Sequence, residues 1–429
     1  MGPSSSIQMG LARGYGPMAN RPTKPRIHLA RDGQQWVFDR MIQETGKVFH
    51  FQTDGRGRLP RSVRSHAMIS KHLGIAARRM RQLAREEQSA GHLVTAMDLY
   101  FAAAELFGNA QHVIFANNDE KSYLHRASVE CYDRVRELAP YRIERIEIEW
   151  EGVTVVGNLH IAPTAEPAPC IFFVPGCDMT KEMYPHPRMN QALQRGMHLF
   201  SFDGPGQGES NLRGIKLTLS NYEEAASAAI DYLLTRPEID PHSLGVYGLS
   251  FGSYWALRIA AKDSRLCAVA APWASCCDLR YLMSVESPRY KQLFTYMTGA
   301  PSEAEFDKLV LSMDLRRIVQ RIACPILLTV GEFDPRSPID EVLTFFDDLR
   351  CPAELWVFAD QHHKVSLTAP NSEALTWLED VHALSCDWLL DRFRGKALVN
   401  EGQIIYVAPE GGGPYGSGSA RKRKWYEES

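Results

Sequence analysis

Residues 245–261, GVYGLSFGSYWALRIAA, contain the pattern on which the rest of the interpretation depends. A short apolar stretch runs into a helical pattern, and at the junction two glycines flank Ser250 in the order G-x-S-x-G. A sharp strand-to-helix turn needs glycine at Gly248 and Gly252, because a β-carbon there would collide with neighbouring backbone. Such a turn pushes the serine hydroxyl outward, although the five residues alone fit an ordinary glycine-rich turn equally well.

Compact apolar segments alternate with helical patterns on both sides of this turn. Strands buried on both faces and joined by crossover helices predict the α/β class, with a doubly wound, mostly parallel sheet. The expected helices cover residues 189–195, 222–234, 341–349 and 371–393. The expected strands are CIFFVPG (170–176), HLFSFDGPG (198–206), SLGVYG (243–248), LCAVAAP (266–272), PILLTVGE (325–332) and ELWVFAD (354–360).

The chain divides into four predicted regions. Residues 1–34 are a flexible basic arm, and residues 35–140 form an all-helical domain, because apolar residues recur there at three- and four-residue intervals. Residues 141–395 form the catalytic domain, which begins with an antiparallel strand pair over 142–162. Residues 396–429 form a tail that is partly disordered.

Composition narrows the class of protein. Up to residue 85 the chain carries 16 Lys plus Arg against 4 Asp plus Glu, although the net charge of the whole chain is −3. We expect this basic region to dock on the acidic larger domain or on a second subunit, with a homodimer through the helical domain as one form. A nucleic-acid or membrane partner is not expected. Nine cysteines without a C-x-x-C pair indicate neither a disulfide framework nor a zinc site, and suit a reducing, cytoplasmic setting.

Two later strand ends carry the residue types that would activate a serine. Asp334 follows PILLTVGE, and His362 and His363 follow ELWVFAD, in the chain order serine, acid, histidine. A serine hydroxyl needs an imidazole to accept its proton, and the imidazole needs a carboxylate to hold its tautomer. In an extended loop only one histidine can face the site, and the spacing from Phe358 favours His362. His363 is then a loop residue with an auxiliary role at most.

Backbone N–H groups for a developing oxyanion are expected at two places. One is Phe251, directly after the serine, and the other is Cys177 in the loop VPGCDMTKE, where Asp178 is a candidate substrate-binding neighbour. The stretch FDGPGQGES (202–210) does not have G-x-G-x-x-G spacing, and we expect no helix directly after it, so it predicts a loop beside the site and no dinucleotide. No cofactor and no metal are expected; the expected ligand is a small-molecule substrate.

Residues 90–395 resemble the α/β-hydrolases with an amino-terminal helical cap, the family of 2,6-dihydropseudooxynicotine hydrolase and of the fungal heptaketide naphthopyrone hydrolases that shorten polyketides. The similarity lies in GLSFGSYWALRIAA, FDGPGQGE, PGCDMTKE, GEFDP, DQHH and the cap stretch AGHLVTAMDLYFAAAELF. It implies a triad of Ser250, Asp334 and His362 beneath a cap that closes over the pocket. It also implies an extra acidic residue, for which Glu286 is the counterpart if it is not simply a surface glutamate. Ser253 departs from the pattern, where a third glycine is common.

The resulting expectation is a serine hydrolase that cleaves a carbon–carbon bond next to a ketone, or an ester, in a polyketide-like or aryl-ketone metabolite. Three alternatives stay open. The same site would suit a condensation or cyclisation without net hydrolysis, or a simple carboxylesterase, and the fold alone would suit a catalytically silent binding protein.

Overall fold

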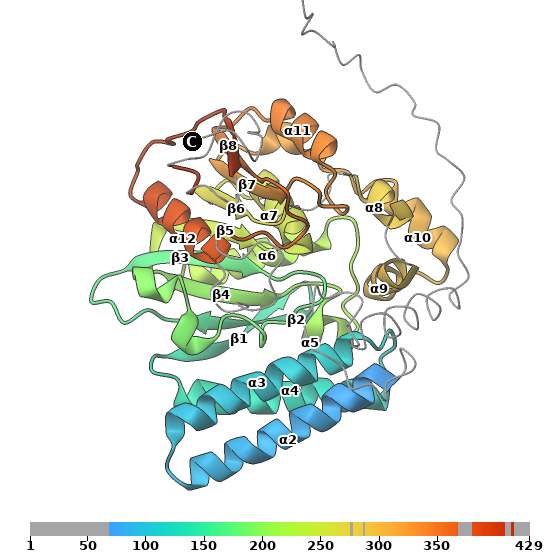
Figure 1. The fold of residues 1–429 in the computed structure, drawn as a ribbon, viewed down its shortest axis with the longest axis vertical. Coiled ribbons are helices and arrows are strands. Elements are labelled where there is room, and N and C mark those ends of the chain that lie inside the picture. Colours follow the sequence, from blue (N-terminus) through green and yellow to red (C-terminus); the bar gives the residue numbers. More distant parts are fainter. Residues whose placement is uncertain (1–67, 275–277, 286–287, 368–379, 408–412, 416–429) are drawn as a thin grey trace, which may run out of the picture.

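The computed structural model describes residues 68–274, 278–285, 288–367, 380–407 and 413–415 (Figure 1). The predicted basic arm, the start of the predicted helical domain (35–67), the start of the expected helix at 371–393 and Glu286 lie outside these ranges. The described chain consists of one large sheet with helices on both faces and a three-helix group beside β1 and β2 (Figure 1). This is the predicted α/β-hydrolase architecture with an amino-terminal helical domain.

Nine strands of the described chain form a single sheet in the order β1-β2-β4-β3-β5-β6-β7-β8-β9. Strands β3 to β9 run parallel, while β1 pairs with β2 and β2 with β4 in antiparallel fashion. The predicted strand pair at 142–162 is therefore confirmed, and it turns through Glu151 and Gly152, both at positive φ. The strands are β1 (Ile143–Trp150), β2 (Val153–His160), β3 (Ala168–Val174), β4 (His198–Asp203), β5 (Ile239–Gly248), β6 (Ala268–Ala271), β7 (Ile326–Gly331), β8 (Ala353–Phe358) and β9 (Ile404–Val407).

Both faces of the sheet are buried, which explains why its strands are apolar without alternation. On one face Val246 of β5 belongs to a core shared with α6 (Asn221–Leu233) and α7 (Phe251–Lys262). On the other face its neighbour Tyr247 belongs to a core shared with α12 (Asp380–Phe393). The carboxyl ends of the parallel strands are left at one edge, where loops can place functional side chains.

In the described part of the amino-terminal region, from residue 68 on, the chain forms three helices: α2 (Ile69–Ser89), α3 (Leu93–His112) and α4 (Asp119–Leu138). Their own apolar core includes several alanines of α3, whose small side chains let the helices approach closely. Asn118 caps α4 by accepting a hydrogen bond from the Lys121 N–H at 2.8 Å. Further helices follow β6, namely α8 (Leu279–Val285), α9 (Pro288–Thr298) and α10 (Glu303–Val310).

Several predicted boundaries need correction. The expected helix at 189–195 is two single 3-10 turns, Pro187–Met189 and Leu193–Arg195. A short helix, α5 (Gly208–Leu212), begins directly within FDGPGQGES, where we expected none. The catalytic domain extends past residue 395, because β9 pairs with β8. Strand β9 has only four residues and lies within a stretch of polar sequence, so its pattern was too short to predict a strand. The predicted helix at 341–349 is α11 (Ile339–Asp348).

Candidate active site

Ser250 occupies the tight turn between β5 and α7. Its backbone has φ 56° and ψ −122°, a conformation that non-glycine residues rarely adopt. A β-carbon at Gly248 would lie 2.2 Å from the Gly252 carbonyl oxygen, and one at Gly252 would lie 2.1 Å from the Val174 carbonyl oxygen. Both glycines are thus required by close backbone approaches, as the sequence predicts. Strain of this kind persists where the surrounding structure holds it and gathers at functional sites.

The serine hydroxyl meets an imidazole and a carboxylate from two later strand ends. The Ser250 Oγ lies 2.7 Å from His363 Nε2, and His363 Nδ1 lies 2.6 Å from Asp334 Oδ2. Asp334 follows β7 and His363 follows β8, and both side chains are buried. With the carboxylate accepting the proton on Nδ1, the Nε2 lone pair faces the hydroxyl, which is the tautomer that can accept a proton from the serine.

The structure corrects the preference for His362. His362 is exposed, and its Nδ1 lies 3.1 Å from the Phe333 carbonyl oxygen, away from the serine. The prediction assumed that the loop after β8 continues extended. Instead Asp360 adopts a φ of 60°, so the chain turns and the next inward position falls one residue later, at His363.

The acid and histidine loops are fixed to each other by backbone contacts. A β-carbon at Gly331 would lie 1.9 Å from the His362 carbonyl oxygen, so only glycine lets the two loops touch. The Phe333 N–H donates to the Gln361 carbonyl at 2.8 Å. The other carboxylate oxygen of Asp334 accepts from the Arg336 N–H at 2.9 Å, which orients the acid toward the histidine. These contacts hold the Ser250–His363–Asp334 relay in place before any substrate binds.

The two predicted oxyanion donors belong to segments next to Ser250. Phe251 is the first residue of α7, where backbone N–H groups have no partner within the helix. The loop after β3 passes close by, since a β-carbon at Gly176 would be 3.6 Å from the Ser250 β-carbon, and Cys177 comes next. The Cys177 thiol points elsewhere and donates to the Tyr290 hydroxyl at 3.8 Å, so the backbone of Cys177 is its relevant part. Asp178 lies at the same loop, with its Oδ1 3.3 Å from that Gly176 position.

Aromatic side chains border the relay. The Trp273 ring centroid lies 6.0 Å from that of His363, and the Phe251 ring meets Phe294 of α9 edge-on at 4.4 Å. Tyr290 of α9 joins this group through Cys177. Helix α9 therefore contributes buried aromatic side chains beside the residues that flank the nucleophile.

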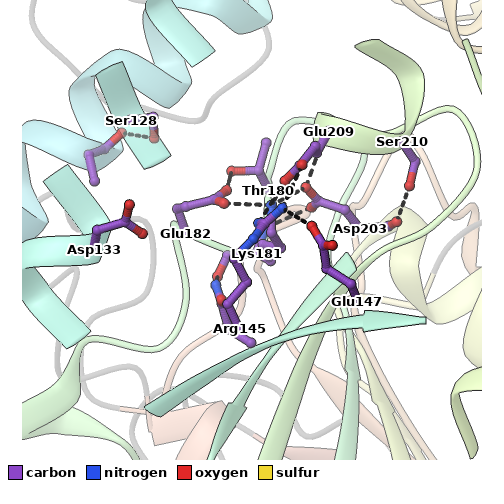
Figure 2. Close-up of polar contacts among 12 residues, drawn as sticks. Ser128, Asp133, Arg145, Glu147, Thr180, Lys181, Glu182, Asp203, Glu209 and Ser210 are labelled. Carbon is purple, nitrogen blue, oxygen red and sulfur yellow. Dashed lines mark hydrogen bonds and ion pairs between the residues drawn. The ribbon is translucent and has the colours of Figure 1, made fainter. Parts of the chain in front are cut away.

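A buried charge cluster, which sequence reasoning missed, anchors the same loop further along (Figure 2). The fully buried Lys181 ammonium lies 2.6 Å from Glu182, 3.1 Å from Asp203 and 3.0 Å from Glu209, and Arg145 of β1 forms two hydrogen bonds to Glu209. Burial disfavours the ammonium, but the three carboxylates outweigh it and raise the pKa of Lys181. The four residues Lys181, Glu182, Asp203 and Glu209 lie in the quoted PGCDMTKE and FDGPGQGE stretches, but nothing in those stretches indicates that they meet.

The helical domain joins the sheet through a second buried polar group. His160 of β2 lies between two tyrosine hydroxyls, 3.1 Å from Tyr132 of α4 and 3.0 Å from Tyr141. Burial lowers the pKa of His160 to about 3, so the ring stays neutral, donating from one nitrogen and accepting at the other.

Among the described residues, no group of three or more His, Cys, Asp or Glu side chains is arranged to hold a metal ion. In the same part of the chain, no helix combines the length and apolarity that crossing a bilayer requires.

Two family models match the chain. The model described as "Esterase FrsA-like" matches residues 75–289, and the model described as "Prolyl oligopeptidase family" matches residues 191–392. The first match runs from the helical domain through the Ser250 turn and into the helices beyond it, whereas the second covers the sheet from β4 to α12.

Named relatives show the same pattern. The chain is 31% identical over 308 residues to 2,6-dihydropseudooxynicotine hydrolase of Paenarthrobacter nicotinovorans, covering 70% of this chain and 81% of that protein. It is 30% identical over 202 residues to 20-hydroxy-prefusarin hydrolase FUS2 of Gibberella moniliformis, covering 44% of this chain and 48% of the relative, so it spans about half of that fungal protein. The crystal structure of the 2,6-dihydroxy-pseudo-oxynicotine hydrolase superposes with a TM-score of 0.67 at 26% identity, covering 79% of this chain and 92% of that one.

Proposed function

We propose that this chain, which belongs to the FrsA-like esterase family of α/β-hydrolases, is a serine hydrolase with Ser250 as nucleophile. The chain is also similar to 2,6-dihydropseudooxynicotine hydrolase in sequence and in structure. The observation that carries the proposal is the continuous relay from Ser250 through His363 to Asp334, at 2.7 Å and 2.6 Å. Two adjacent hydrogen bonds of this length, made at the ends of three different strands, match what an activated serine requires.

The first step forms a tetrahedral intermediate on Ser250. The Ser250 Oγ attacks a substrate carbonyl carbon while His363 Nε2 takes the hydroxyl proton, and Asp334 stabilises the imidazolium through Nδ1–H. The carbonyl oxygen becomes an oxyanion and accepts hydrogen bonds from the backbone N–H groups of Phe251 and Cys177. Fixed donors of this type lower the barrier because they need no reorganisation as charge develops.

Collapse of this intermediate expels the leaving group. With a β-diketone, the bond between the attacked carbonyl carbon and its α-carbon breaks, and the electron pair leaves as an enolate that His363 protonates. Water then attacks the acyl-serine, with the same histidine as base, and releases a carboxylic acid and Ser250. The net reaction consumes one water and yields one acid and one ketone. With an ester the leaving group is an alcohol.

The proposed substrate class is a polyketide-like or aryl-ketone small molecule. The aromatic surroundings of the relay, Trp273 beside His363 and Tyr290 beside Cys177, support a planar apolar substrate. The names of two relatives, 2,6-dihydropseudooxynicotine hydrolase and 20-hydroxy-prefusarin hydrolase, support the same direction.

The test combines labelling with product mass. A fluorophosphonate should label the wild type at Ser250, and Ser250→Ala should show no labelling. Aryl β-diketones and simple aryl esters are then offered to both proteins, and products are identified by mass spectrometry. From a β-diketone, two fragments whose masses together equal substrate plus water indicate carbon–carbon hydrolysis. Hydrolysis of esters alone would reduce the proposal to an esterase, and a product of unchanged or water-depleted mass would indicate cyclisation. An unlabelled wild type that leaves every substrate intact would refute the proposal.

A further inference from the structure

Gln207 is a buried polar side chain in the FDGPGQGE stretch that the relay does not use. It lies between β4 and α5, only 4% exposed, and its side-chain amide points to the loop after β3. Its Nε2 donates to the Gly176 carbonyl oxygen at 2.8 Å and reaches the Pro175 carbonyl oxygen at 3.4 Å. It therefore contacts the backbone directly before the oxyanion donor of Cys177.

The peptide group between Gly176 and Cys177 contains both the carbonyl oxygen that Gln207 contacts and the N–H that is the expected oxyanion donor. The group is planar, and in its trans form the carbonyl oxygen of Gly176 and the N–H of Cys177 point in opposite directions. A donor that holds the oxygen on one side consequently fixes the direction of the N–H on the other. The Met179 N–H donates to the same oxygen at 3.1 Å, so this peptide plane is held at two points.

The orientation of Gln207 is itself determined by its neighbours. The Tyr222 hydroxyl lies 2.6 Å from Gln207 Oε1 and donates to it. The Gly176 carbonyl can only accept, so the amide nitrogen must face Gly176 and the amide oxygen must face Tyr222. Tyr222 is fully buried and stacks on Trp255 of α7 at a centroid distance of 4.7 Å and 12°. The line of contacts runs from α6 and α7 through Tyr222 and Gln207 to the oxyanion loop.

From this chain of contacts we infer that Gln207, held by Tyr222, is a positioning residue that aims and polarises the Cys177 N–H for the oxyanion of the proposed reaction. The inference rests on the proposed function and extends it to a residue that does not touch substrate. Donation to the Gly176 oxygen draws charge through the same amide, which makes the Cys177 N–H a stronger donor. The contribution grows as charge develops on the substrate oxygen, so it lowers the barrier more than it strengthens substrate binding.

Two variants test the inference. Gln207→Leu removes the three side-chain hydrogen bonds of Gln207 at similar volume, and Tyr222→Phe removes only the hydroxyl while keeping the ring on Trp255. Loss of a direct oxyanion donor lowers kcat by about 10²–10³-fold, so an indirect effect of about 10–100-fold in kcat is expected for Gln207→Leu and a smaller one for Tyr222→Phe. KM should change little. Gln194→Leu, at an exposed glutamine, is the matched control and should behave as wild type.

A transition-state analogue separates positioning from a structural role. An arylboronic acid forms a tetrahedral adduct on the serine, so its affinity should fall by the same factor as kcat/KM in both variants, with the double variant no worse than Gln207→Leu alone. Wild-type rates in both variants would overturn the inference. A loss of kcat/KM that comes from a higher KM with unchanged boronate affinity would also overturn it. The same holds if a lower melting temperature in both variants accounts for their loss of activity. A wild type that reacts with neither substrate nor boronate would instead refute the proposed function, and the inference with it.

Discussion

The two adjacent histidines allow a sharp test of the relay. His363 connects Ser250 to Asp334, whereas the exposed His362 lies with its Nδ1 3.1 Å from the Phe333 carbonyl oxygen. Replacing His363 with glutamine removes the base that takes the serine proton. Loss of a triad histidine lowers kcat by about 10⁴–10⁶-fold in serine hydrolases, which corresponds to about 5–8 kcal/mol at 1.36 kcal/mol per tenfold.

His362→Gln is the matched control, because the same change is made one residue earlier in the same loop. A substitution at an exposed position away from the site changes free energies by about 0.5 kcal/mol or less, so kcat should stay within about threefold of wild type. The assay is steady-state ester hydrolysis together with the rate of fluorophosphonate labelling, with melting temperatures measured for both variants. Equal activities in the two variants, or a larger loss in His362→Gln, would show that the relay is wrong.

Three further predictions concern stability and the serine turn. Lys181→Met leaves three carboxylates without their buried ammonium and should lower the free energy of unfolding by about 3–5 kcal/mol in urea titrations. The control Lys308→Met, at an exposed lysine, should change it by less than about 0.5 kcal/mol, and equal effects would contradict a role of the cluster in stability. Gly252→Ala places a β-carbon 2.1 Å from the Val174 carbonyl oxygen of β3 and should abolish fluorophosphonate labelling. In the control Gly395→Ala the new β-carbon meets no atom within 4 Å, so this variant should cost only about 1–2 kcal/mol of backbone strain and keep its labelling. Burial lowers the pKa of His160 to about 3, so between pH 6.5 and about 3 the unfolded state binds a proton at this residue that the folded state does not, and stability falls as pH falls through that window. His160→Gln should reduce the slope of the unfolding free energy against pH by about 1.4 kcal/mol per pH unit near pH 5. An unchanged slope would rule this out.

Much of the fold followed from local pattern. The change from helical periodicity to apolar segments near residue 141 separated the helical domain from the sheet, and α2, α3 and α4 all lie within the predicted helical region 35–140. The strand ends that carry Ser250 and Asp334 were identified for the same reason, because buried parallel strands are continuous apolar runs bounded by turn residues. The weak points were short elements: β9 has four residues and α5 has five, too few for a period to emerge.

The site was predictable only in part. Residue types and their order in the chain indicated a serine, an acid and a histidine, but the choice between His362 and His363 depended on the turn at Asp360, which has no strong sequence signal. The charge cluster around Lys181 and the contact from Gln207 to Gly176 were unpredictable, because they join loops about 20 to 30 residues apart in the chain through side chains that sequence would place at the surface.

Sequence alone was sufficient for the properties that are local along the chain: the class of each element, the two glycines that a tight serine turn demands, and the polar residues waiting at strand ends. Which of those polar groups meet, at what distance and in which orientation, was decided only by tertiary packing. A hydrogen bond depends on the position of both partners to within a few tenths of an ångström, and a single residue at positive φ, such as Asp360, redirects every side chain that follows it. Periodicity fixes the face of an element and carries no information about the loop beyond its end.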